Sequence, residues 1–163
     1  MGSGVTPQKL REAIAETMAD CVKSYDVADA CVALTYCALY AEPDGFDLPA
    51  LVPQVYVHYD PYTKRQLGNR SGQLKRQRMD FLMLLSQRSR VVLEVDGQQH
   101  CATADGAADP VRYAEMAAED RSLRLAGYEV YRFGAHELTA DRAVDGLRTF
   151  FRELLTAHHV LPA

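Results

Sequence analysis

The stretch MDFLMLLSQRSRVVLEVDGQQH, residues 79 to 100, decides the fold class of this chain. Two runs of mainly apolar side chains, Met79 to Leu85 and Arg90 to Asp96, are joined by the short polar link at 86–89. Short apolar runs joined by a polar link of this length are typical of two antiparallel strands in a hairpin. The rest of the sheet is expected to assemble around this hairpin.

Helical and strand patterns surround the hairpin. The predicted elements, in chain order, are helices at 6–25 and 27–40, strands at 51–59, 79–85 and 90–96, a helix at 109–126, a strand at 128–133 and a helix at 139–157. A helix between the last two strands favours a parallel arrangement of those strands. The order ααβββαβα predicts an α/β (α+β) fold with a mixed four-stranded sheet flanked by helices.

Several helix ends carry recognisable signals. Thr6 is a candidate N-cap with Pro7 at the first helical position, and Asp109 with Pro110 repeats this arrangement. Gly127 is placed to end the helix that Asp109 opens.

Length and composition fit one compact globular unit. The chain has 163 residues, of which 48% are hydrophobic and 25% charged, and it has no apolar run of about 18 residues that could span a bilayer. Residues 1–5 are interpreted as a leader or an expression scar, which suggests a piece of a longer protein. Residues 6–50 form the predicted helical hairpin, and 51–163 the core with its C-terminal helix.

The four cysteines give no metal-site spacing. Cys21, Cys31, Cys37 and Cys101 form no CxxC pair and have no histidine at zinc-finger spacing. We interpret them as free thiols in a reducing compartment, which predicts a cytoplasmic location.

Basic residues are concentrated before the hairpin. Residues 61–78 contain no acidic residue and six basic ones, Lys64, Arg65, Arg70, Lys75, Arg76 and Arg78. Since the whole chain carries −4 and this segment +6, the remainder carries −10. A local positive charge on an acidic body suits contacts with nucleic-acid phosphates, and a solvated loop is the alternative.

Three acids interrupt the apolar strands. Glu94 and Asp96 share one strand face, because residues i and i+2 project to the same side, and a hairpin brings Asp80 toward the same end. Buried carboxylates need a positive partner, and oxygen ligands of this kind suit Mg²⁺ or Mn²⁺. The alternative is ion pairing with Arg78, Arg90 or Arg132, or exposure at strand ends.

These residues resemble the PD-(D/E)XK nuclease superfamily, in the branch of small domains similar to very-short-patch-repair endonucleases. The resemblance rests on Asp80, thirteen intervening residues, the segment EVDGQQH, the pair Asp120-Arg121 and the strand GYEVYRF, and it covers about residues 51–138. It implies a restriction-endonuclease-like core and metal-dependent hydrolysis of DNA. It also implies that Asp80 and Glu94 bind the metal, helped by the carbonyl of Val95.

One position departs from the family pattern. Asp96 stands where the family usually has a catalytic lysine, and we expect it to act as a further ligand or as a base. Gln98 and His100 follow as candidates for orienting water or transferring a proton, and Asp120 and Arg121 as support for the site or as an exposed ion pair. Glu12 and Glu16 are the candidates for an additional acid from a helix.

The leading hypothesis is therefore a Mg²⁺- or Mn²⁺-dependent endonuclease domain acting on DNA, with RNA not excluded, in a prokaryotic defence, restriction or repair system. The missing lysine motivates an alternative, a nuclease-fold module that binds nucleic acid or takes part in assembly without catalysis. The helical hairpin at 6–50 is a further candidate, either as a homodimer surface or as core, and fusion to a larger defence protein is also considered.

Overall fold

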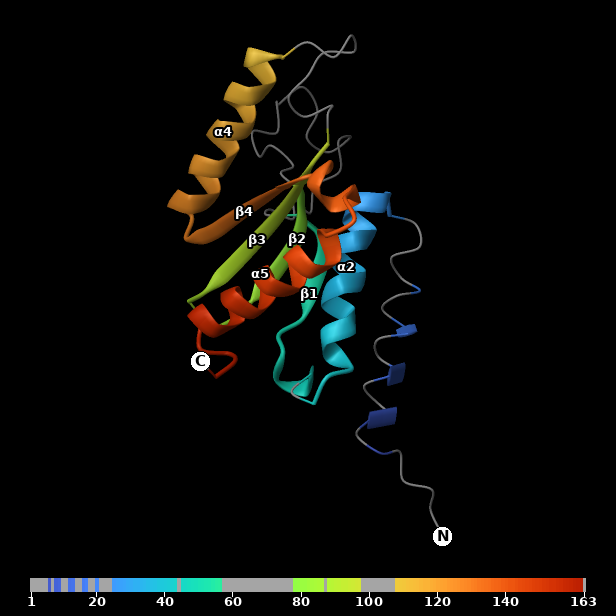
Figure 1. The fold of residues 1–163 in the computed structure, drawn as a ribbon. Helices are drawn as coiled ribbons and strands as arrows, with labels where there is room; N and C mark the ends of the chain where they lie inside the picture. The colour runs from blue at the N-terminus through green and yellow to red at the C-terminus, as the bar shows by residue number, and fades with distance from the viewer. Residues whose placement is uncertain are drawn as a thin grey trace, which may run out of the picture.

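A computed structural model describes residues 25–43, 45–56, 78–86, 88–97 and 108–162, together with positions 6, 8, 9, 12, 13, 16, 17 and 20 (Figure 1). The positions described between 8 and 20 are helical, as predicted. Thr6 Oγ1 accepts a hydrogen bond from the Lys9 N–H at 3.3 Å, as expected of an N-cap. The predicted strand end at 57–59 lies outside the described residues.

The described chain forms a mixed α/β fold with a four-stranded sheet. The strands β1 (Leu51–Tyr56), β2 (Arg78–Leu84), β3 (Arg90–Asp96) and β4 (Tyr128–Gly134) lie side by side in chain order. β1 pairs with β2 and β2 with β3 in antiparallel fashion, whereas β3 and β4 are parallel. The predicted hairpin and the predicted parallel pair are both confirmed.

Three longer helices pack around this sheet in the described parts of the chain. They are α2 (Val27–Tyr40), α4 (Pro110–Leu125) and α5 (Ala143–Ala157), with short 3-10 turns η2 (Gly45–Asp47) and η4 (Glu137–Thr139). The prediction of one helix from Thr139 was wrong by one turn, because Thr139 ends η4 and Ala140 has extended backbone. None of the described helices has the length and apolarity that crossing a membrane requires.

The helix ends follow the sequence signals. Asp26 and Asp109 are the N-caps of α2 and α4, and each carboxylate accepts two backbone N–H groups of the first helical turn. Gly127 follows α4 with a φ of +88°, a left-handed conformation that glycine adopts without steric cost. This residue lets the chain reverse directly into β4.

The two faces of the sheet are covered unequally. α2 and α5 cover one face, where Tyr36 and Phe151 pack with ring centroids 4.8 Å apart beside buried residues of β2 and β3. On the other face, Leu123 of α4 joins a smaller cluster with Met79, Val92 and Val130. The first cluster is the main core. The residues of α2 that belong to it agree with the prediction that this helix is part of the core.

An irregularity in β1 lies opposite the first predicted metal ligand. Pro53 pairs with Phe81 and Val55 with Met79, so that Gln54 falls opposite Asp80. Gln54 has a φ of +52°, which is strained for a residue with a side chain. Phe81 packs in the main core on one face of the sheet, whereas Met79 packs in the smaller cluster on the other face. The regular alternation of side chains along β2 is therefore interrupted at Asp80.

Candidate active site

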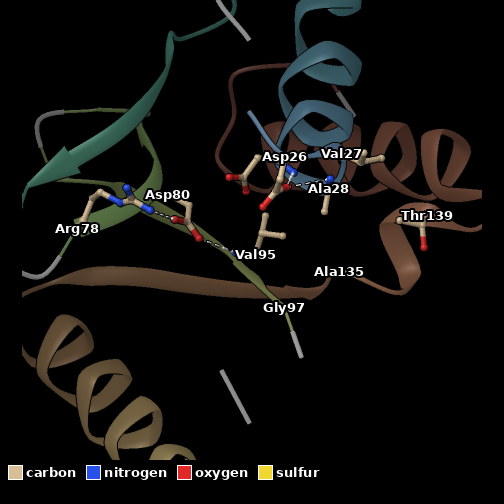
Figure 2. Close-up of a pocket in the computed structure, with 10 residues that line it drawn as sticks. Asp26, Val27, Ala28, Arg78, Asp80, Val95, Gly97, Ala135 and Thr139 are labelled. Carbon is tan, nitrogen blue, oxygen red and sulfur yellow. Dashed lines mark hydrogen bonds and ion pairs between the residues drawn. The ribbon is translucent and has the colours of Figure 1, made fainter. Parts of the chain in front are cut away.

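The Asp80 carboxylate is fixed against the neighbouring strand. The regular β2–β3 pairing ends at Phe81 and Leu93, and beyond it the Val95 N–H donates to Asp80 Oδ2 at 2.9 Å (Figure 2). The side chain thus accepts a bond from a strand N–H where the regular ladder stops. Asp80 Oδ1 lies 3.8 Å from Arg78 Nη2, a long contact with a half-exposed side chain. This oxygen therefore has only a weak cationic partner.

Glu94 lies beside Asp80 in a partly buried position. Burial, the negative charges of Asp80 and Asp96 and a hydrogen bond with Asp80 raise the pKa of Glu94 to about 8, against the opposing charge of Arg132. Two carboxyl groups therefore meet at this point with too little positive charge for both to ionise easily. A bound cation is one physical remedy for such a pair.

Asp80 lines a pocket of about 360 Å³ at one end of the sheet. The carboxyl ends of β3 and β4 and the amino end of α2 meet there (Figure 1). Its lining includes Asp26, Arg78, Asp80, Val95 and Thr139 (Figure 2). The pocket combines acidic side chains with one arginine and a hydroxyl group.

Asp29 in the first turn of α2 is a site residue that the sequence analysis missed. Burial raises the pKa of Asp29 to about 6, and the charges of Asp80 and Asp26 act in the same direction while Arg78 opposes them. Glu12 and Glu16 were the candidates for an additional acid from a helix. Both of these are exposed. The sequence signal for Asp29 was weak, since acids in a first helical turn ordinarily serve the helix itself.

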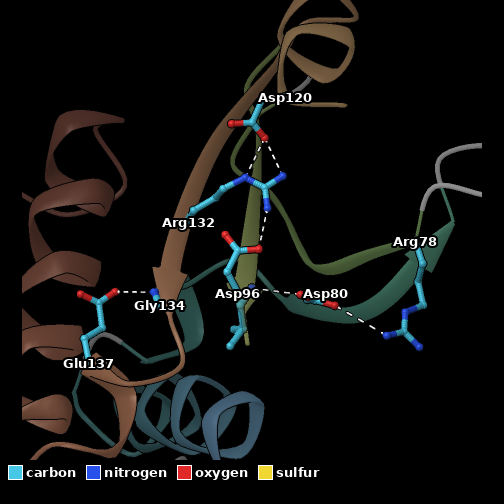
Figure 3. Close-up of polar contacts among 8 residues, drawn as sticks. Arg78, Asp80, Asp96, Asp120, Arg132, Gly134 and Glu137 are labelled. Carbon is cyan, nitrogen blue, oxygen red and sulfur yellow. Dashed lines mark hydrogen bonds and ion pairs between the residues drawn. The ribbon is translucent and has the colours of Figure 1, made fainter. Parts of the chain in front are cut away.

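Asp96 has a different environment from Glu94. Arg132 Nη1 lies 2.9 Å from Asp96 Oδ1, and Arg132 Nη2 lies 2.6 Å from Asp120 Oδ1 (Figure 3). The salt-bridge alternative therefore describes Asp96 better than the roles of direct ligand or base. Asp120 pairs with Arg132, so for this residue the geometry favours a supporting role over the alternative of an exposed ion pair with Arg121.

Several predicted site residues lie outside the described part of the chain. These are Lys64, Arg65, Arg70, Lys75, Arg76, Gln98 and His100. The cysteines divide in the same way, since Cys31 and the buried Cys37 lie within the described residues and Cys21 and Cys101 lie outside.

The described residues fit a cation held by few protein ligands. Within this part of the chain, no group of three or more His, Cys, Asp or Glu side chains is arranged to hold an ion. Asp80 and Glu94 remain as a pair on adjacent strands, close enough to share a proton. Mg²⁺ commonly takes one or two carboxylates and completes its shell with water and phosphate oxygens, so the pair suits it.

Comparisons of the chain with protein-family models, with curated proteins and with solved structures found no match.

Proposed function

We propose that this chain is a metal-dependent endonuclease domain of the PD-(D/E)XK type that hydrolyses DNA phosphodiester bonds. The observation that carries the proposal is the meeting of Asp80 and Glu94 on adjacent strands, with Asp80 lining the pocket and fixed by the Val95 N–H. The element order and the mixed sheet are compatible with a restriction-endonuclease-like core. We extend the proposal to a cytoplasmic protein of a prokaryotic defence, restriction or repair system.

The chemistry assigned to the site is hydrolysis at phosphorus. The oxygen of a water molecule forms a bond to phosphorus while one ester P–O bond breaks, and the departing oxygen takes a proton to become a hydroxyl group. A bound Mg²⁺ or Mn²⁺ would supply charge neutralisation at the phosphoryl oxygens and lower the pKa of the attacking water. Asp80 and Glu94 would hold this ion, with the Val95 carbonyl as the third protein ligand that the resemblance implies.

The chain's other residues have supporting roles in the proposal. The basic side chains of residues 61–78 would contact the phosphate backbone, and Arg78 reaches the pocket itself. Contacts of this kind position a duplex without reading its sequence. Gln98 and His100, which follow β3 directly, stay candidates for orienting the water.

Cleavage of supercoiled plasmid and of labelled oligonucleotides, with Mg²⁺ or Mn²⁺, tests this proposal. We expect Asp80→Asn and Glu94→Gln to reduce cleavage at least about 100-fold, since each removes a charge that holds the ion. Asp141→Asn and Glu153→Gln, which change exposed acids away from the pocket, are matched controls and should cleave as the wild type does. A pure wild-type protein that leaves DNA and RNA intact with both metals would refute a catalytic function.

A nuclease-fold module without catalysis is the second candidate. It is favoured by one observation, the pairing of Asp96 with Arg132 at the position where the family usually has a lysine. This candidate predicts no calorimetric binding of Mg²⁺ or Mn²⁺. It further predicts either duplex binding that weakens steeply with salt and needs no metal, or no nucleic-acid binding.

A further inference from the structure

The strand beside Glu94 carries a cation at the same level. β3 and β4 are parallel, and their register places Glu94 opposite Arg132. Paired residues of adjacent strands project their side chains to the same face of a sheet. Arg132 therefore approaches the acid pair from the neighbouring strand, two residues before β4 ends at Gly134.

Two carboxylates hold this arginine in a fixed orientation. Its Nη1 donates to Asp96 Oδ1 at 2.9 Å, and its Nε and Nη2 donate to Asp120 Oδ1 at 2.8 and 2.6 Å. The exposed fractions of the three side chains are 19% for Arg132, 17% for Asp96 and 23% for Asp120, so the group is mostly shielded from water. Figure 3 shows Arg132 between the two acids, with Asp96 on the side nearer Asp80.

Within the described residues, the guanidinium group keeps donors for another ligand. An arginine has five N–H donors, and the three bonds to Asp96 and Asp120 use three of them. The described part of the chain leaves one N–H on each terminal nitrogen without a hydrogen bond. Arginine is well suited to phosphate, because its planar group can donate two parallel hydrogen bonds to two oxygens.

We propose that Arg132 supplies the positive charge at the scissile phosphate that Asp96, in place of a lysine, cannot supply. This inference rests on the proposed nuclease function and concerns the same site. Arg132 is then a catalytic residue that contacts the phosphate, and Asp96 and Asp120 are positioning residues that orient it. In this arrangement the cation comes from β4 and not from β3.

The choice of arginine limits the chemistry at this point. A guanidinium group stays protonated throughout the accessible pH range, so it stabilises negative charge but does not transfer a proton. Proton transfer must then involve water or another group. The rate of the wild type should accordingly show no pH dependence that comes from this cation.

A pair of double variants tests the inference. Asp96→Asn with Arg132→Gln removes the arginine together with the acid that it would leave unpaired, so the fold is less disturbed than by Arg132→Gln alone. Asp96→Lys with Arg132→Gln differs only at position 96 and returns a cation to β3. Single-turnover cleavage of a duplex is measured with Mg²⁺, duplex affinity with Ca²⁺, and the melting temperature for each protein.

We expect the Asn/Gln protein to cleave about 100-fold more slowly than the wild type or worse, a loss typical of removing one donor from a developing anion. Its duplex affinity should change little, since one phosphate contact among several contributes modestly. The Lys/Gln protein should recover part of the rate and gain a new pH dependence from the lysine. Arg132→Lys should retain part of the rate as well.

Three results would overturn the inference. They are wild-type cleavage by the Asn/Gln protein, equal rates for the two double variants when both are folded, and a loss of rate explained fully by weaker duplex binding. Failure of the proposed function itself is distinguishable, because the wild type would then show no metal-dependent cleavage. One combination of results would separate the two proposals: cleavage by the wild type and by the Asn/Gln protein, but no cleavage by Glu94→Gln. The nuclease function would then be supported, and the role of Arg132 would be refuted.

Discussion

The two ends of the sheet differ in how well their polar side chains are paired. At the end where β3 and β4 begin, His158 links two elements, with Nδ1 2.9 Å from Ser89 Oγ and Nε2 2.9 Å from Glu129 Oε2. Glu129 also accepts a hydrogen bond from the Tyr131 hydroxyl group. At this histidine end every named group has a complementary partner, and the contacts tie the C-terminal end of α5 to the sheet.

At the end where β3 and β4 finish, the described acids outnumber the described cations. Asp80 and Glu94 face each other, and the pKa values of Glu94 and Asp29 are both raised, mainly by burial. Raised pKa values of this kind mark groups whose ionised forms are unfavourable in the folded chain. Since the same sheet has a well-satisfied end, the difference argues that the acid end serves a ligand and not stability.

The largest expected effect comes from Glu94→Gln, which should abolish cleavage while changing the pH dependence of stability. The pKa of Glu94 is about 8 in the folded chain against an ordinary 4.5, so the folded state binds its proton more tightly. Stability from this group is full below about pH 4.5 and is lost as the pH rises toward 8. At about 1.4 kcal/mol for each pKa unit, the loss amounts to a few kcal/mol.

Urea unfolding between pH 5 and 9 measures this effect. The wild type should lose stability with rising pH, and Glu94→Gln should be less sensitive and more stable than the wild type near pH 9. Glu153→Gln, at an exposed position on α5, is the matched control. Equal slopes for wild type and Glu94→Gln would show that the acid end is not under electrostatic strain.

A metal ion bound by Asp80 and Glu94 should stabilise the folded chain. Mg²⁺ or Mn²⁺ at 100 times its dissociation constant should stabilise the wild type by about 2.7 kcal/mol, because it binds only the folded chain. At a fixed metal concentration the gain should grow between pH 6 and 8, because the dissociation constant falls as Glu94 loses the proton that competes with the ion. Thermal unfolding with and without metal measures it, and Asp80→Asn should remove it. A similar gain in Asp80→Asn would place the ion elsewhere.

The sequence predicted the sheet well because its signals are local. The hairpin at 79–96 and the link between β3 and β4 depend on apolar periodicity and on a short turn, which neighbouring residues determine. The helix caps at Asp26 and Asp109 have the same local origin, although the sequence analysis named only the second. The start of α5 was misplaced because the 3-10 turn at 137–139 and the extended Ala140 have no strong sequence signal.

The partners of the acids were harder to predict. Asp80 and Glu94 were expected together, since a hairpin register brings them to one end. The attachment of Asp96 to Arg132 depends on the parallel register of β3 and β4, and the approach of Asp29 depends on how α2 packs on the sheet. Both are tertiary contacts between segments far apart in the chain. Hydrophobic periodicity does not specify them.

His158→Ala changes the end of the sheet where β3 and β4 begin. Removing the imidazole leaves Ser89 and Glu129 without this shared partner and loosens the end of α5. We expect a loss of about 1 to 3 kcal/mol in the free energy of unfolding, the usual cost of deleting such hydrogen bonds, with cleavage unchanged. His136→Ala, an exposed histidine, is the control. A large loss of cleavage in a folded His158→Ala protein would mean that the two ends are coupled.

The smallest effects concern two backbone positions in the left-handed region, which should respond in opposite directions. Gly127 has a φ of +88° and open space where a Cβ would lie, so Gly127→Ala should cost about 1 kcal/mol through backbone strain alone.

His159 follows the C-cap of α5 with a φ of +59°. The His159 N–H donates to Thr156 O and the Val160 N–H donates to Leu155 O, and these two bonds complete a Schellman motif. A glycine suits this position better, so His159→Gly should gain up to about 1 kcal/mol. Urea midpoints measure both. A destabilised His159→Gly protein would show that the His159 side chain contributes more to anchoring α5 than its backbone strain costs.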